Sequence, residues 1–167
     1  MCTGKGTALM STNEGNIRDY RGRDRYKNPP LPCIAIPTTA GSGSEVSKFT
    51  IFEDEITHVK MVAGGINSAP KAAILDPLLL RTVPLRQAIG SGTDALAHCI
   101  EALAAKGATL LTDGLALTAM EMIVRNFRSS ILGQDLDAMG EMLYAASIAN
   151  FACGNAGSGL AHGINLG

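Results

Sequence analysis

The chain has 167 residues, of which 46% are hydrophobic, so it is long enough and apolar enough to fold around a packed core. Its formal net charge of -1 gives no electrostatic reason to expect a nucleic-acid or membrane-surface partner. No apolar run reaches the length of a membrane span, and the four dispersed cysteines form no C-x-x-C pair, so we expect reduced thiols in a cytoplasmic protein.

The first elements mix helix, loop and surface patterns. Residues 5–10 are typical of the end of a helix, and residues 12–16 of a loop. Residues 18–32 are charged and then proline-rich, so we expect them to run over the surface.

Strand patterns follow. The short apolar runs "CIAIP" (33–37) and "KAAILD" (71–76) each end at or before a proline, which predicts two buried strands. Between them, residues 48–62 are rich in strand formers on both sides of an acidic turn, which predicts a β-hairpin.

From residue 84 onward the hydrophobic period changes to that of helices. Alanine, leucine, methionine and isoleucine recur at helical spacing up to residue 103, over residues 111–127 and over residues 136–152. The sequence therefore predicts an α/β segment over 1–82 followed by an all-α segment over 83–167.

Both ends of the sequence look interrupted. The opening "MCTGKG" already has helical character with no strand before it, and "HGINLG" ends without a helix terminus. We therefore expect an internal piece of a longer chain.

Within "GSGTDALAHCIEAL" (90–103), Asp94 and His98 are four residues apart and project from one helix face. This spacing suits a carboxylate and an imidazole on one divalent metal ion. On spacing alone, an Asp–His ion pair or a helix cap is the commoner interpretation. Glu101 shares the face and could be a ligand, an acceptor for a ligand or a solvated residue.

The other histidines differ in setting. His162 lies among glycines and small residues in "NAGSGLAHGINLG", where it is either a third metal ligand or a core histidine. His58 lies in the predicted hairpin, and we expect it at the surface.

Two further features could contact a nucleotide. Thr38, Thr39 and Ser42 lie in "TTAGSGSE", a loop after a predicted strand that could offer hydroxyl and backbone N–H groups to phosphates, or could be a simple Ser/Gly turn. Lys60 precedes a glycine pair and could meet a phosphate or ribose, or be solvated. By contrast, "GSGTDA" matches a dinucleotide fingerprint only formally, because no strand precedes it.

Four blocks in order resemble the iron-containing (group III) alcohol dehydrogenase family. The blocks are "IAIPTTAGSGSEV" (34–46), "KMVAGGINSAPKAAILDP" (60–77), "GTDALAHCIEA" (92–102) and "GNAGSGLAHG" (154–163). The resemblance implies a dehydroquinate synthase-like architecture, with a partial dinucleotide-binding domain and hairpin over 1–82 and a partial helical metal-binding domain over 83–167.

The resemblance also implies a chemistry. Such enzymes interconvert alcohols with aldehydes or ketones, using NAD or NADP and usually Fe²⁺, sometimes Zn²⁺. Asp94, His98 and His162 match three metal ligands that are also the catalytic positions. The matching cofactor-binding residues are Thr38, Thr39, Ser42 and Lys60. The implied partner is a small alcohol or aldehyde, without nucleic acid or membrane and with self-association into a homo-oligomer open.

The chain also departs from the family pattern. The glycine-rich "GGGS" motif is absent, Cys2 stands where the family usually has Asp, and Leu166 replaces a family histidine. The family's fourth ligand would fall after residue 167. The alternatives to an alcohol dehydrogenase are therefore a catalytically inactive remnant that binds metal or self-associates, and, less well supported by the residues, a metallohydrolase.

Overall fold

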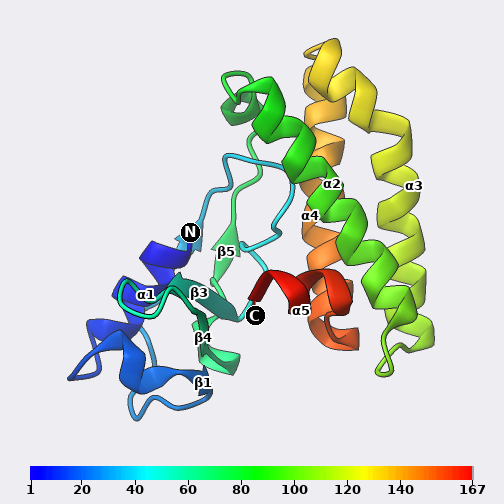
Figure 1. Cartoon of the computed structure of the whole chain (residues 1–167). Coiled ribbons are helices and arrows are strands. Elements are labelled where there is room, and N and C mark those ends of the chain that lie inside the picture. The colour runs from blue at the N-terminus through cyan, green and yellow to red at the C-terminus, as the bar shows by residue number, and fades with distance from the viewer. Residues whose placement is uncertain (167) are drawn as a thin grey trace.

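The computed structural model describes residues 1–166, in which a small α/β lobe leads into a bundle of long helices (Figure 1). The first lobe contains α1 (Cys2–Met10), the 3₁₀ turn η1 (Ile17–Tyr20) and the strands β1 (Gly22–Arg23), β3 (Phe49–Glu53) and β4 (Lys60–Gly64). The strands form one sheet in the order β1-β4-β3, with β3 antiparallel to β4 and β1 parallel to it. The predicted helix, loop and hairpin are confirmed, although the helix begins at Cys2.

A second sheet pairs β2 (Ile34–Ala35) with β5 (Ala72–Ala73) in parallel. Both predicted strands exist, but the expectation that they are buried holds for only part of the first, in which Ala35 is 5% exposed. Ile34 is 67% exposed and Ile36 is 47% exposed, and both residues of β5 are exposed. A sheet of only two strands, each of two residues, cannot enclose its own side chains.

The helical half follows the predicted pattern closely. After the turns η2 (Ile66–Ser68) and η3 (Pro77–Leu80), the chain forms α2 (Leu85–Ala104), α3 (Leu110–Leu132), α4 (Leu136–Ala156) and α5 (Leu160–Leu166). Thr109 and Asp135 accept hydrogen bonds from backbone N–H groups in the first turns of α3 and α4, which fixes where these helices begin.

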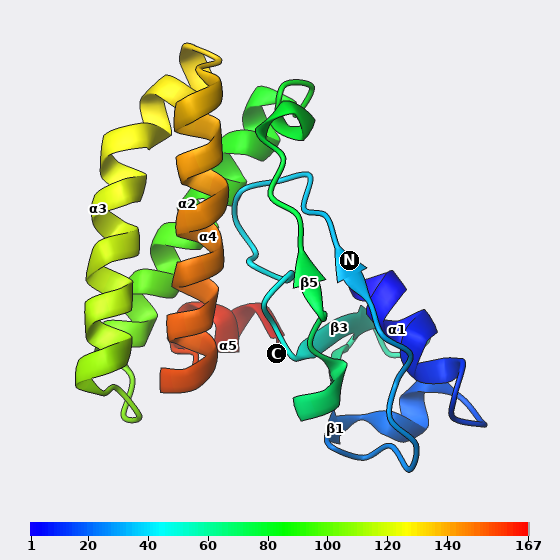
Figure 2. The same ribbon diagram turned by 180° about the vertical axis from the view of Figure 1, so that it is seen from behind.

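Small side chains form the core between α2, α3 and α4, which lie side by side (Figure 2). Fully buried alanines line all three helices: Ala95 and Ala102 on α2, Ala116 and Ala119 on α3, and Ala145 and Ala149 on α4. Alanines let helix backbones approach closely, which accounts for a tight bundle in a chain with few aromatic residues. Within the described residues, no helix has both the length and the apolarity needed to cross a membrane.

Lys5 ties α1 to the segment that leads into β3. Its side chain is 4% exposed, and its Nζ donates to the carbonyl oxygens of Ser44 at 2.9 Å, Ser47 at 3.0 Å and Phe49 at 2.6 Å. A few residues away, the buried carboxylate of Glu45 accepts a 2.6 Å hydrogen bond from Ser147 on α4. Residues 44–49 are therefore held from both sides.

Two free cysteines lie in the core, and we expect them to make the protein sensitive to alkaline pH. Burial raises the pKa of Cys99 and of Cys153 to about 11, from an ordinary value of 9.0. Between these values the unfolded thiols lose protons that the folded thiols keep, so the unfolded state is favoured. Stability should fall as pH rises from about 9 towards about 11, by at most ~1.4 kcal/mol per pH unit for each thiol.

Urea unfolding at several alkaline pH values measures this effect. The double variant Cys99→Ala, Cys153→Ala should lose less stability over the same pH window than the unmodified chain. Identical slopes for the two proteins would show that the buried thiols do not contribute.

Candidate metal centre

The structure brings Asp94, His98 and His162 together. Asp94 and His98 lie one turn apart on α2, and α5 carries His162 against them. Each residue offers one ligand atom, and these atoms all lie within 4.8 Å of one another. The Nε2 of His162 is 3.5 Å from Oδ1 of Asp94, and the two imidazoles stack with ring centroids 4.5 Å apart and an interplanar angle of 22°.

The start of α2 at Leu85 excludes two of the simpler interpretations. Residues 90–94 lie inside the helix, so Asp94 is not a cap and "GSGTDA" is not a strand-to-helix turn. The face that carries His98 also carries Ala95, Cys99 and Ala102, which are fully buried in the core. This packing explains why an apolar helix face presents His98 at only 5% exposure.

His98 is held in the form that can bind a metal. Burial lowers its pKa most strongly and His162 lowers it further, while Asp94, Glu101 and the Gly41 backbone only partly offset these effects. The side chain is therefore biased towards the neutral imidazole, whose lone pair is free. Its enclosed Nδ1 meets no hydrogen-bond partner of normal geometry among the described residues.

Glu101 lies behind His162 rather than in the cluster. Its side chain is 8% exposed, and Oε2 is 2.5 Å from Nδ1 of His162. The backbone N–H of His162 donates to Oε1 at 3.1 Å. Burial raises the pKa of Glu101, but hydrogen bonds from the Gly159 and His162 backbones and from the His162 ring lower it below its ordinary value overall.

These residues fit a divalent transition metal. One carboxylate and two imidazoles are donors that suit Fe²⁺ and Zn²⁺. Two ligand atoms about 2.1 Å from a tetrahedral ion lie roughly 3.4 Å apart, close to the separation seen between Asp94 and His162. The side chain of Asp94 is 41% exposed, so the cluster opens to solvent on that side.

Thr38, Thr39 and Ser42 lie together in the loop after β2. This loop packs closely against α2. A Cβ atom at Gly41 would lie only 2.4 Å from the backbone oxygen of Ser91, so only glycine fits there. Asn150 on α4 donates to the carbonyl of Ser42 at 2.8 Å, which fixes the loop on its other side. The loop therefore lies beside the helix that carries Asp94 and His98.

The remaining polar residues singled out in the sequence lie on the hairpin. Lys60 is the first residue of β4, opposite Glu53 in the register. The structure thus places Lys60 on a different element from the threonines and the serine. His58 is exposed, as expected, with Nδ1 3.3 Å from Glu53.

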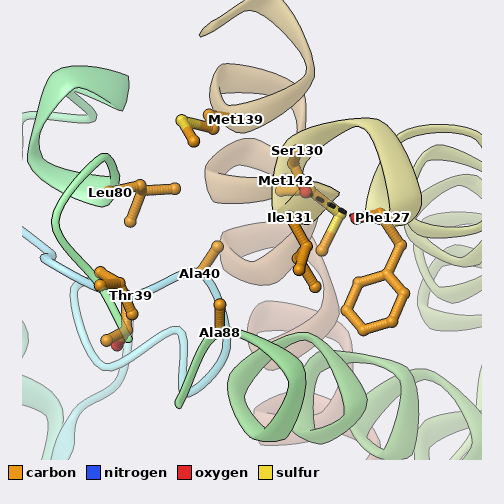
Figure 3. Close-up of a pocket in the computed structure, with 10 residues that line it drawn as sticks. Thr39, Ala40, Leu80, Ala88, Phe127, Ser130, Ile131, Met139 and Met142 are labelled. Carbon is orange, nitrogen blue, oxygen red and sulfur yellow. Dashed lines mark hydrogen bonds between the residues drawn. The ribbon is translucent and has the colours of Figure 1, made fainter. Parts of the chain in front are cut away.

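A small, partly open pocket lies apart from the metal ligands (Figure 3). It measures about 40 Å³ and is lined by side chains that include Thr39, Ala88, Phe127 and Met142. None of Asp94, His98 and His162 lines it.

Comparison with known proteins agrees with the geometry. The family model described as "Iron-containing alcohol dehydrogenase" matches residues 1–77, and the model described as "Fe-containing alcohol dehydrogenase family, C-terminal" matches residues 88–166. The NAD-dependent methanol dehydrogenase of Bacillus methanolicus is 40% identical over 98% of this chain and 43% of its own length. The 1,3-propanediol dehydrogenase of Klebsiella pneumoniae is 37% identical over 96% of this chain and 42% of its own length.

A solved structure shows the same fold. The crystal structure of 1,3-propanediol oxidoreductase superposes with a TM-score of 0.89 at 37% identity, covering 95% of this chain and 42% of that one. The chain therefore spans less than half the length of the relatives it matches. Two models of this family together cover the α/β lobe and the helical bundle, and the solved structure shares the fold at 37% identity. The chain belongs to the iron-containing alcohol dehydrogenase family.

Proposed function

We propose that this chain functions as a metal-dependent, NAD(P)-linked alcohol dehydrogenase that interconverts a small alcohol with its aldehyde or ketone. The observation that supports this function best is the convergence of Asp94, His98 and His162 from two helices. Family membership selects dehydrogenation among the reactions that such a donor set could serve.

Asp94, His98 and His162 would hold the metal ion. Fe²⁺ is the proposed ion and Zn²⁺ the alternative, since both accept imidazole and carboxylate ligands. When bound, such an ion supplies Lewis acidity that polarises a carbonyl or acidifies an alcohol. The carboxylate of Asp94 would supply negative charge to the cation, and the neutral imidazole of His98 would supply a lone pair without adding positive charge.

Thr38, Thr39, Ser42 and Lys60 are the proposed cofactor-binding residues. The hydroxyls of the loop could donate to phosphate or ribose oxygens, and the ammonium of Lys60 could neutralise a phosphate charge. Because Gly41 lets this loop pack against α2, the cofactor would approach the metal ligands from the side on which the loop lies.

The proposal also covers the location, the partners and the domain division of the chain. We propose a cytoplasmic location, in line with four cysteines that are all free in the structure. The substrate would be a small alcohol or aldehyde, and neither nucleic acid nor membrane is a proposed partner. The domain division proposed is an α/β cofactor-binding part over 1–82 and a helical metal-binding part over 83–167.

NADH oxidation with a short aldehyde tests the activity. The chain, prepared without metal under anaerobic conditions, should oxidise NADH only after Fe²⁺ is added, and addition of a chelator should reverse the gain. Aldehyde-dependent oxidation that is equally fast without metal would contradict the proposed mechanism. Metal binding without any oxidation would favour the second candidate.

That second candidate is a non-catalytic module that binds metal or self-associates. Large apolar side chains at the surface favour it, among them Ile34, Ile74 and Leu160 at 67%, 51% and 82% exposure. Sedimentation velocity over a range of concentrations measures association into a homo-oligomer directly. A monomer at all concentrations would remove the argument for self-association.

A further inference from the structure

We infer that Glu101 is a positioning residue that sets the tautomer of His162 before any metal binds. The inference rests on the proposed metal-binding role of His162 and adds a function for a residue outside the ligand set. It follows from the juxtaposition of one buried carboxylate with both the ring and the backbone of His162.

The hydrogen bonds specify which ring nitrogen carries the proton. An ionised carboxylate only accepts hydrogen bonds, so Nδ1 of His162 must donate to Oε2 of Glu101. In the neutral ring this leaves Nε2 without a proton, and Nε2 is the atom that lies 3.5 Å from Asp94. The lone pair of His162 is therefore available on the side of Asp94 and His98, where a ligand is needed.

The same carboxylate fixes where the ring stands. Its other oxygen accepts the backbone N–H of His162 at 3.1 Å. A Cβ at Gly159 would lie 3.0 Å from Cγ and 3.2 Å from Oε1 of Glu101, so glycine permits this close approach. Ring stacking on His98 supports the imidazole from the opposite direction. Glu101 thus ties the start of α5 to α2 and orients the ring at once.

Glu101→Gln separates these two roles. The amide oxygen can still accept the backbone N–H, but the amide nitrogen can only donate to Nδ1, which favours the tautomer with the proton on Nε2. Glu101→Ala removes both roles. The matched control is Glu121→Gln, an exposed carboxylate on α3 that pairs with Arg125.

Nitrogen-15 NMR of the metal-free chain at alkaline pH, where imidazoles are neutral, reads the tautomer directly. The chain has three histidines, so the signals of His162 can be assigned by comparison with His58→Asn and His98→Ala. We expect the proton of His162 on Nδ1 in the unmodified chain and in Glu121→Gln, and on Nε2 in Glu101→Gln. A proton on Nε2 in the unmodified chain would overturn the inference even if no variant folds.

Competition titration with Zn²⁺ supplies the second readout. We expect Glu101→Gln to weaken Zn²⁺ binding by about 10–100-fold, as is usual for the loss of an outer-shell partner, and Glu121→Gln to leave it unchanged. A purely structural cap would leave both the tautomer and the affinity of Glu101→Gln intact while Glu101→Ala loses affinity, and that result would overturn the inference. If the unmodified chain binds no Zn²⁺, the proposed function fails, whereas the tautomer measurement still decides the role of Glu101.

Discussion

His98→Ala is expected to abolish tight binding of a divalent metal. The substitution removes one of three donors in the cluster, and the two that remain, Asp94 and His162, come from different helices. Loss of an outer-shell partner alone typically costs 10–100-fold in affinity, so loss of a ligand should cost at least ~100-fold. Zn²⁺ titration against a chelator of known affinity measures the change, and metal content after dialysis gives an independent value.

The substitution should leave the fold intact. The Nδ1 of His98 lacks a hydrogen-bond partner of normal geometry, so the losses in the metal-free chain are the packing of the buried ring, its stacking on His162 and its contact with the Gly41 backbone. The matched control is His58→Asn, which removes an exposed imidazole on the hairpin and tolerates its positive φ of 54°. If His98→Ala keeps the metal affinity of the control, the cluster does not bind the ion.

Local sequence patterns are sufficient to predict most of the helical half of the fold. Apolar residues at helical spacing predict α2, α3 and α4, and the hairpin of β3 and β4 is visible as two strand-forming runs around an acidic turn. Burial was less predictable. The run around Ile34 has the composition of a buried strand, but exposure depends on how many strands and helices lie beside it, which a local pattern does not contain.

The candidate site likewise has one part that local spacing predicts and another that depends on how distant segments pack. The spacing of Asp94 and His98 is a local property of one helix, so it can be read directly. The approach of His162 depends on the turn between α4 and α5, so the residues alone left open whether it is a ligand or a core histidine, and the family resemblance favoured the ligand. The position of Glu101, three residues after His98 on the same helix, was the available signal for its role, but spacing could not decide between ligand and supporting acceptor.

Contacts between distant segments left no local signal at all. Lys5 meets carbonyl groups that are 39 to 44 residues away, and Glu45 meets Ser147 across 102 residues. In the sequence Lys5 is an ordinary basic residue in a short helix. Its burial arises because α1 lies against β3 and the loop before it, an arrangement that only the three-dimensional structure shows.

Lys5→Met is expected to destabilise the fold by about 3 kcal/mol or more. Methionine has a similar length but no donor, so the carbonyl oxygens of Ser44, Ser47 and Phe49 would lose their shared partner. Hydrogen bonds from a charged donor contribute roughly 1.5–3 kcal/mol each, and buried acceptors left unpaired add a desolvation cost. Burial of the ammonium lowers the pKa of Lys5 below its ordinary value despite the nearby Glu45, so the cost of burying this charge offsets part of the loss.

Urea unfolding measures the loss, and hydrogen exchange over residues 44–49 shows where it arises. The matched control is Lys106→Met in the exposed turn after α2, which should change stability by less than about 0.5 kcal/mol. Because residues 44–49 follow the loop of Thr38, Thr39 and Ser42, faster exchange there would mean that Lys5 also steadies the proposed cofactor loop. A Lys5→Met chain as stable as the control, with unchanged exchange, would show that packing alone holds this segment.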